Sequence, residues 1–295
     1  MNETLKRTIS GAVYIALLLT SILFSTESFI ILFGIFLIIA TYEFCNLVKI
    51  NKVVSILFVT LFYSTVTLTS FYRVETENYI NKLLKDNIQI TVDTDKLFSV
   101  LLVITLMVSI KCIFFLFDDT QSISKVSKYI YLIGYIILPF LFITKISFGI
   151  KDYNPKIIIG LFVLIWTNDT FAYLVGKSMG KHKLFERISP KKTIEGFLGG
   201  VVFAGFAGFL ISKLYIQPNP EFSNKSILIW MIIALIVSIF GTIGDLIESK
   251  FKRVAGVKDS GAIMPGHGGV LDRLDSVIFV APIIFLFYQI LYYVS

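Results

Sequence analysis

Long apolar runs alternate with short polar connectors along almost all of the 295 residues. A transmembrane helix needs about 20 mostly apolar residues to cross the hydrocarbon core of a bilayer. Nine runs approach or reach that length. The pattern therefore predicts an all-α integral membrane protein, a polytopic bundle of about nine transmembrane helices. We expect the spans at residues 9–24, 29–48, 53–71, 97–117, 129–148, 157–176, 196–216, 227–247 and 274–294.

Composition agrees with a membrane protein. Hydrophobic residues make up 56% of the chain and the mean hydropathy is +0.81. Charged residues make up 16%, against roughly 25% in an average soluble domain. The net charge of +7 comes from residues in the connectors between spans. Positive charge in that position sets the orientation in the membrane and favours anionic substrates. We therefore do not interpret it as a sign of a nucleic-acid partner. Cys45 and Cys112 stand apart in apolar segments and are interpreted as buried structural thiols.

The lysines and arginines indicate an orientation. Most of the 27 fall in connectors that share one side of the membrane if the N-terminus is cytoplasmic. Nine spans then put the C-terminus outside. The first apolar run is interpreted as a retained span, with a cleaved signal peptide as the alternative. The connector at residues 72–96 is polar and is expected to be a solvated loop on the outer side.

Two large polar connectors, residues 177–195 and 249–273, fall together on the predicted cytoplasmic side. Residues 1–150 contain no comparable polar segment. We therefore interpret residues 1–150 as a membrane scaffold with a lipid-facing wall. Residues 151–295 are interpreted as the functional region.

The stretch at residues 244–276 concentrates charge between two apolar runs. Asp245 and Glu248 are three residues apart and Glu248 and Lys252 are four apart, so a helix places them on one face. Asp272 and Asp275 repeat the spacing of three. Two carboxylate pairs joined by a glycine-rich turn can converge on hard cations, which take oxygen ligands. The alternative is a solvated basic loop with incidental acids. The remaining charged side chains of the stretch are Lys250, Arg253, Lys258, Asp259 and Arg273, with His267 between glycines.

Asp169 interrupts an apolar run. It lies about 12 residues into the predicted span at residues 157–176, roughly 18 Å along a helix. A carboxylate at that depth is costly, so an ionisable residue inside a membrane is a functional hypothesis by default. The alternative is a structural pair with a lysine or a polar cap between helices.

A second candidate anion site follows. Ser189 and Pro190 are typical of a helix start, with serine as the cap and proline at the first helical position. A helix N-terminus beside Lys191 and Lys192 can bind an anion through its amides and its dipole. The alternative for these lysines is an anchor at the level of the lipid head groups. Five glycines within residues 196–208 are interpreted as a helix-packing face.

The polar stretches resemble a known family. Residues 249–253 read SKFKR, residues 258–261 read KDSG, residues 265–269 read PGHGG and residues 271–275 read LDRLD. This series closely resembles the signature of the phosphatidate cytidylyltransferases, also called CDP-diacylglycerol synthases. Met264 departs from the pattern, which usually has Leu, Ile or Phe there. Residues 168–169, 180–183, 189–193 and 195–196 are also similar to family segments, so the resemblance extends from about Asp169 to the C-terminus.

The resemblance implies a reaction. CTP and phosphatidate would give CDP-diacylglycerol and pyrophosphate at a cation centre that holds Mg²⁺, with K⁺ as a further candidate ion. Carried over by position, Asp245 and Asp272 are the best metal ligands, and Asp275 and Asp169 are further members. We expect catalytic residues at Asp245, Asp272, Lys258, Arg273 and His267, and substrate contacts at Ser189, Lys191, Lys192, Glu248, Lys252, Arg253 and Asp259.

Physical chemistry agrees with this reaction. A phosphomonoester is already largely ionised near neutral pH, so the nucleophile needs no strong base. The difficulty is that an anionic nucleotide must meet an anionic lipid, and cations must neutralise both. The expected partners are CTP, phosphatidate and the bilayer, with catalytic loops in the cytoplasm, a bacterial plasma membrane as location, and a homodimer as one assembly.

Two other functions remain open from the sequence. A CTP-dependent lipid kinase acting on a polyprenol or phytol would use similar spans and metals, but it would release CDP instead of pyrophosphate. A transporter would spread polar residues along several spans and would show inverted repeats. The gathering of charge at one side of the membrane favours the transferase.

Overall fold

The computed structural model describes residues 3–72, 93–119, 122–148, 153–216 and 223–294. Most of the predicted outer loop at residues 72–96 lies outside this part of the chain. The helices are α1 (Glu3–Phe24), α2 (Thr26–Val48), α3 (Lys52–Phe71), α5 (Thr94–Phe117), α6 (Lys125–Tyr131), η1 (Leu132–Ile137), α7 (Leu138–Ile146), α8 (Pro155–Met179), α9 (Ile194–Leu210), η2 (Ile211–Ile216), α10 (Ser223–Ala255) and α11 (Leu271–Val294).

The predicted fold class is confirmed. Within the described residues, nine helical segments are long and apolar enough to cross a membrane. One of them, Lys125–Ile146, consists of α6, η1 and α7, and 78% of this span is buried inside the protein, the largest share of the nine. By contrast, only 17% of the α1 span is buried inside the protein, the smallest share of the nine. The fifth span is therefore central to the bundle and α1 is peripheral.

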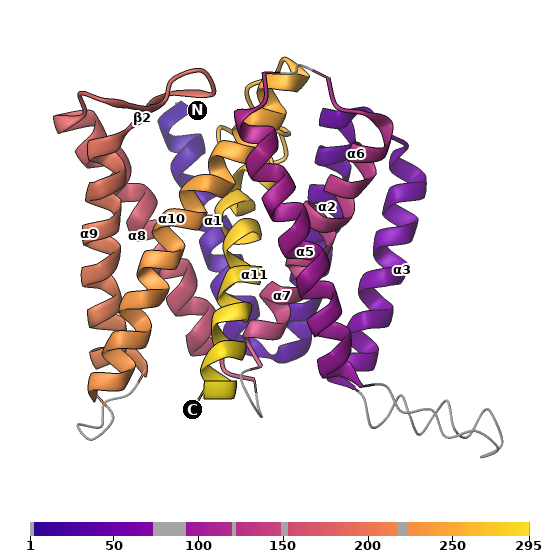
Figure 1. Cartoon of the computed structure of the whole chain (residues 1–295), viewed down its shortest axis with the longest axis horizontal. Helices are drawn as coiled ribbons and strands as arrows, with labels where there is room; N and C mark the ends of the chain where they lie inside the picture. Colours follow the sequence, from indigo (N-terminus) through magenta and orange to yellow (C-terminus); the bar gives the residue numbers. More distant parts are fainter. Residues whose placement is uncertain (1–2, 73–92, 120–121, 149–152, 217–222, 295) are drawn as a thin grey trace.

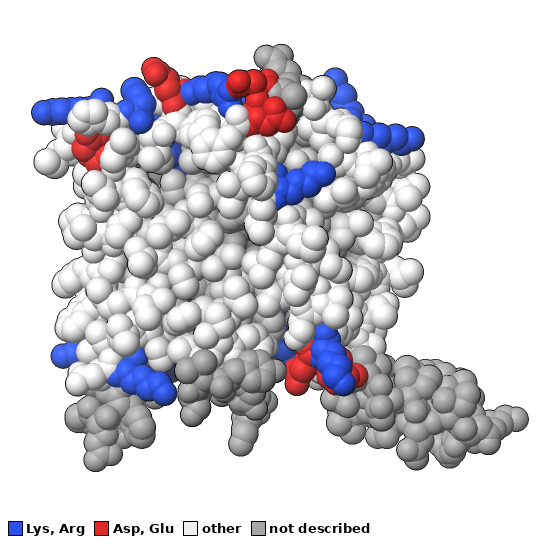
Figure 2. Space-filling view, in the orientation of Figure 1, with Lys and Arg blue, Asp and Glu red and all other residues white. Residues whose placement is uncertain are grey.

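Charged side chains gather at the two ends of the bundle and leave an apolar band between them (Figure 2). The N-terminus lies at the same end as the strand β2 and the end of α10, and the C-terminus lies at the opposite end (Figure 1). We call the end with the N-terminus the polar end. The apolar band is the surface that a bilayer would cover.

The connector between α8 and α9 is a β-hairpin, which corrects the predicted helix start at Ser189. Strand β1 (Lys183–Phe185) pairs antiparallel with β2 (Ser189–Thr193), and Lys183 lies opposite Thr193. Ser189 and Pro190 are therefore in a strand. Thr193 is the N-cap of α9, and its side chain accepts the Gly196 N–H at 3.1 Å. The helix therefore starts four residues later than predicted, with a threonine as its cap. The segment in which the Ser-Pro pair predicted a helix start pairs as a β-strand instead.

The two helices of the glycine-rich stretch are longer than their predicted spans. α10 runs past residue 247 to Ala255, and α11 already begins at Leu271. The helices are joined by residues 256–270, which we call the loop. Asp245, Glu248 and Lys252 thus share α10, while Asp272 and Asp275 lie in the first turns of α11.

Cations from two elements hold the end of α5. Arg187 of the hairpin donates to the carbonyls of Leu116, Phe117 and Asp118 at 3.3–3.5 Å. Lys250 of α10 donates to the Asp118 carbonyl at 2.7 Å. Cations stabilise the negative end of a helix dipole, so these bonds fix the hairpin and α10 relative to α5.

Candidate active site

Asp272 ties the loop to α10. Its Oδ2 accepts the N–H and O–H of Ser260 and the N–H of Gly269, each at 2.8 Å. Its Oδ1 accepts from Lys252 Nζ at 2.7 Å, and Lys252 also pairs with Glu248. Lys252 thus bridges Glu248 and Asp272, one member of each carboxylate pair, while convergence of the pairs on a cation stays a prediction.

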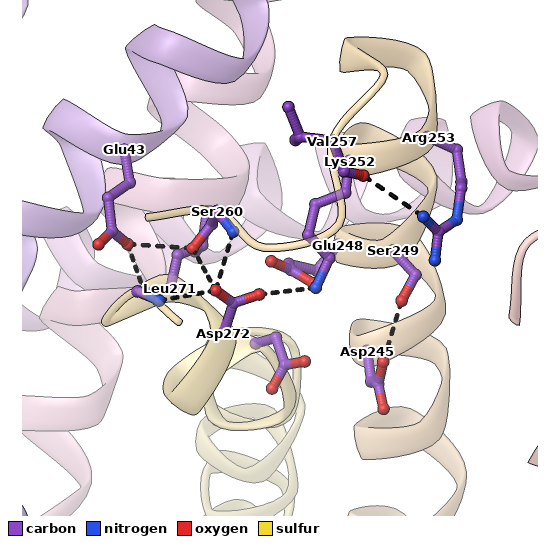
Figure 3. A network of polar contacts seen from close by, with 12 residues as sticks. Glu43, Asp245, Glu248, Ser249, Lys252, Arg253, Val257, Ser260, Leu271 and Asp272 are labelled. Carbon is purple, nitrogen blue, oxygen red and sulfur yellow. Dashed lines mark hydrogen bonds and ion pairs between the residues drawn. The ribbon is translucent and has the colours of Figure 1, made fainter. Parts of the chain in front are cut away.

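Glu43 of α2 completes this arrangement from the N-terminal half of the chain. Its side chain accepts the N–H of Val270 at 3.1 Å and that of Leu271 at 2.8 Å, and the Ser260 hydroxyl at 3.2 Å. Figure 3 shows Glu43 and Asp272 meeting at Ser260 from either side. Glu43 is 1% exposed, so its charge is stabilised mainly by these donors at the start of α11. We call Glu43, Ser260, Lys252 and Asp272 the anchoring cluster.

Glycines allow these carboxylates to approach the loop backbone. A Cβ added at Gly269 would collide with both Glu43 carboxylate oxygens and with Ser260 Oγ. Gly268 has a φ of +83°, and a Cβ there would collide with Asp272 Oδ2. A side chain at either position would push the acids away from the amides. Gly268 and Gly269 of the PGHGG motif therefore serve the anchoring cluster.

A cavity of about 200 Å³ opens beside this cluster. It is bounded by α1, α8, α11 and the loop. One part of its lining is polar and the other is apolar. The lining residues are Gly11, Tyr14 and Ile15 of α1, Ile165, Trp166 and Asp169 of α8, Met264 and His267 of the loop, and Asp272, Arg273, Asp275, Ser276 and Val277 of α11.

Three carboxylates, Asp169, Asp245 and Asp275, lie close enough to repel one another. They come from α8, α10 and α11. Asp245 pairs with Lys192 of β2 at 2.6 Å, while Asp169 and Asp275 have no ion pair among the described residues. Asn168 donates to Asp169 at 3.2 Å, and the Ser276 N–H donates to Asp275 at 2.7 Å. We call these three carboxylates the cavity acids.

The donor set fits a hard cation, because carboxylates from three helices lie near one another and, among the described residues, only Asp245 of the three forms an ion pair. The buried Glu248 Oε1 also has no hydrogen-bond partner among the described residues. Within the described part of the chain, no three His, Cys, Asp or Glu side chains already converge at metal-ligand geometry. The predicted ligands Asp169, Asp245 and Asp275 thus neighbour one another, whereas Asp272 is engaged by the anchoring cluster.

His267 contacts α1. Its Nδ1 lies 2.7 Å from Ser10 Oγ, and Ser10 also lies 3.0 Å from the Pro265 carbonyl. If Ser10 donates its single proton to Pro265, its oxygen accepts the Nδ1–H of His267. Burial, and then the charges of Arg273 and Arg7, lower the pKa of His267 below its ordinary value. The imidazole is therefore neutral near pH 7.

The remaining residues that were predicted to bind substrate or to act in catalysis differ in position and exposure. Arg253 donates to the carbonyls of Ile188 at 3.2 Å and Val257 at 3.3 Å, so it links the turn of the hairpin to the loop. Arg273 is exposed and lines the cavity. Roles in substrate binding stay predictions for this set. Ser189 is half-buried, and Lys191, Lys258 and Asp259 are exposed at the polar end.

Sequence reasoning missed the contribution of α1 and α2. Glu43 is an acidic residue inside the apolar run at residues 29–48, which is the same signal that drew attention to Asp169. Ser10 and Tyr14 gave no such signal, because short polar and aromatic side chains are common in spans. The division at residue 150 stays a prediction, but α1 and α2 both contact the loop, and α1 also lines the cavity.

Comparison with known proteins identifies the family. The model of the cytidylyltransferase family matches residues 5–291, nearly the whole chain. This chain belongs to the cytidylyltransferase family. The match includes α1 and α2 as well as the loop, in keeping with their contacts in the structure.

Curated relatives of this cytidylyltransferase-family chain carry the name phosphatidate cytidylyltransferase. One from Staphylococcus aureus (strain COL) is 53% identical over 123 residues, which are 42% of this chain and 45% of the relative. One from Bacillus subtilis (strain 168) is 41% identical over 189 residues, 64% of this chain and 65% of the relative. The alignment with the staphylococcal relative thus spans about half of its length.

Proposed function

We propose that this protein is a phosphatidate cytidylyltransferase that transfers the cytidylyl group of CTP to phosphatidate. The single observation that carries the proposal is the cavity beside the anchored loop, whose lining includes Asp169, Asp275 and Arg273. Asp245 lies near the two acids but outside the lining. The family and the names of the relatives support the same reaction. A CTP-dependent lipid kinase would be distinguished by its product, CDP.

The reaction forms one bond and breaks one. A phosphate oxygen of phosphatidate bonds to the α-phosphorus of CTP, the bond from that phosphorus to the bridging oxygen of the β-phosphate breaks, and pyrophosphate leaves. The nucleophile is already ionised near neutral pH, so the protein needs to position two anions and to neutralise them. Arg273 of the cavity lining and Lys192, which pairs with Asp245, are the cations that we propose for this role.

Asp169, Asp245 and Asp275 would hold Mg²⁺, and Asp272 could join them if Lys252 moved away from Oδ1. Bound there, the ion would neutralise phosphate oxygens and stabilise the charge that develops on the leaving pyrophosphate. K⁺ as a second ion is part of the proposal. The protein's own contribution is the rigid spacing of α10 and α11: a Cβ added at Gly244 would meet the Asp275 carbonyl at 2.7 Å.

The membrane supplies the lipid. The polar end faces the cytoplasm in this proposal, which agrees with the cytoplasmic N-terminus expected from the lysine and arginine distribution. The protein would lie in a bacterial plasma membrane, as in the organisms of its relatives. A homodimer is the proposed assembly.

The test is pyrophosphate release by the purified protein in detergent, given CTP, dioctanoyl phosphatidate and Mg²⁺, with the lipid product identified by mass spectrometry. We expect release only when all three components are present, together with CDP-diacylglycerol in equal amount. Release of CDP, or no product from a protein that unfolds cooperatively on heating, would refute the proposal.

A further inference from the structure

Tyr14 of α1 carries a buried hydroxyl without a hydrogen bond. The side chain is 8% exposed, and its oxygen has no partner among the described residues. A buried hydroxyl left unpaired costs free energy, so its persistence beside a cavity needs an explanation. Tyr14 is one of the residues that line the cavity. The charged side chains that act on it are Arg273 and Asp275.

The helix that presents Tyr14 is mostly exposed to the apolar surroundings. Val13 is 59% exposed, and Ile15, which lines the cavity, is still 39% exposed. Ile15 thus borders both the cavity and the surface that a bilayer would cover. A cavity with such a wall suits an amphipathic ligand, whose polar group meets Tyr14 and Arg273 while its apolar chain extends past α1 into the lipid.

We propose that the Tyr14 hydroxyl donates a hydrogen bond to the phosphate of the lipid substrate, held between Tyr14 and Arg273. This inference rests on the proposed function and assigns a substrate contact to a helix outside the family signature. The phosphate supplies the acceptor that the hydroxyl lacks. Arg273 supplies the opposite charge from the first turn of α11.

Depth favours the lipid over the nucleotide as the ligand of Tyr14. Tyr14 lies seven residues along α1 from Arg7, roughly 10 Å below it. Arg7 packs against Gly266 of the loop at the polar end. A nucleotide that reached Tyr14 would also have to bring its polar ribose and base beside the apolar lining residues Ile15 and Val277, at a cost in desolvation. A phospholipid already brings its phosphate to the edge of the hydrocarbon region.

The test compares Tyr14→Phe with a matched variant, Tyr63→Phe. Tyr63 is also buried, at 7% exposure, but its hydroxyl donates to the Ile30 carbonyl at 3.0 Å away from the cavity. Each variant loses one buried hydroxyl and keeps the ring. Activity with CTP and dioctanoyl phosphatidate gives KM for each substrate, and thermal unfolding in detergent gives Tm without substrate.

We expect opposite responses from the two variants. Tyr14→Phe should raise KM for phosphatidate roughly 10- to 100-fold, the range for a hydrogen bond to a charged group. KM for CTP should not change, and Tm should stay the same or rise, because an unpaired buried hydroxyl is removed. Tyr63→Phe should lower Tm and leave both KM values unchanged. In a binding assay without CTP, dioctanoyl phosphatidate should raise the Tm of the wild type more than that of Tyr14→Phe, and dioctanoylglycerol should raise neither.

Several results would overturn the inference. An unchanged KM for phosphatidate in Tyr14→Phe, or an equal rise in both KM values, would remove Tyr14 from the lipid site. A lower Tm in Tyr14→Phe without substrate would mean that its hydroxyl serves the fold. If the wild type itself makes no CDP-diacylglycerol, the proposed function fails, whereas an active wild type with an equally active Tyr14→Phe refutes this inference alone.

Discussion

The anchoring cluster and the cavity acids lie side by side and use the same residue types in different ways. Asp272 and Glu43 share the single proton of the Ser260 hydroxyl; besides it, Asp272 accepts three hydrogen bonds and Glu43 accepts two. Asp169 and Asp275 each accept one from a neutral donor. A carboxylate that accepts several hydrogen bonds is held in one position. Carboxylates that accept few hydrogen bonds and lie near one another repel, and this repulsion favours the binding of a cation between them. The number of hydrogen bonds thus distinguishes Asp272 and Glu43, which hold the loop, from Asp169 and Asp275, which are available to bind a cation.

The comparison distinguishes between four aspartates that the sequence predicts to have the same role. Asp245, Asp272, Asp275 and Asp169 are all predicted metal ligands, and Asp272 is one of the two strongest by resemblance. In the structure, Asp272 has the most donors of the four. If it binds a metal, it does so while it also holds Ser260 and Gly269 in place.

The largest expected effect comes from Asp275→Asn. Loss of a cavity acid should lower kcat at least about 10³-fold, because several kcal/mol of electrostatic stabilisation are removed at 1.36 kcal/mol per tenfold. Tm without Mg²⁺ should stay the same or rise, since the variant relieves repulsion with Asp245 and Asp169. Pyrophosphate release and thermal unfolding in detergent measure the two quantities.

Asp272→Asn is the matched comparison for this prediction. The change has the same size, but it weakens four hydrogen bonds of the anchoring cluster, so Tm should fall together with activity. Equal Tm changes in the two variants would erase the distinction between the two groups of carboxylates.

An intermediate effect is expected for Glu43→Gln. The amide retains an oxygen acceptor but brings its own N–H₂ group toward the N–H groups of Val270 and Leu271. The stability should fall by about 1–3 kcal/mol, the usual consequence of unpaired buried groups. Activity should fall with it, because the loop loses its attachment to α2.

Glu27→Gln provides the control on the same helix. Glu27 is at the opposite end of α2 and accepts from the exposed Tyr72 hydroxyl at 3.2 Å. Its replacement should change stability by less than about 0.5 kcal/mol. A Glu43→Gln protein as stable and active as Glu27→Gln would show that the loop does not depend on α2.

The smallest effect concerns pH. The pKa of His267 is lowered, so between its folded and unfolded pKa values the unfolded chain binds more protons and stability rises with pH. The contribution of neutral His267 is complete above about 6.5, its ordinary value, and is lost as pH falls through the lower folded pKa. Tm measured between about pH 5 and 8 should therefore decline more steeply on the acid side in the wild type than in His267→Gln. Parallel curves would exclude this contribution.

Sequence patterns predicted most of the fold, because spans follow from apolar length alone. Asp245, Glu248 and Lys252 were placed correctly on one helix face by their spacing. The hairpin at Ser189 was missed because a local capping signal competes with strand pairing, which depends on residues 183–185. A capping signal within a few residues does not show whether a segment will start a helix or pair as a strand.

The positions of the site residues relative to one another were less predictable. Glu43 and Leu271 are 228 residues apart, and no local rule pairs them. The glycines around His267 were visible in the sequence, but their purpose depends on the carboxylates that approach them. Tyr14 became noticeable only when its hydroxyl proved to be buried without a partner.

The partners of Glu43 have a consequence for biosynthesis. The hydroxyl and the two amides that Glu43 accepts from lie 217 to 228 residues further along the chain. At roughly 5–20 residues per second, a ribosome needs on the order of 10–50 s to make that length. During this time α2 would enter the membrane with a carboxyl group that lacks its final donors. The nascent protein must therefore keep Glu43 protonated or near water until the loop and α11 have been made, so the active site cannot close before that point of synthesis.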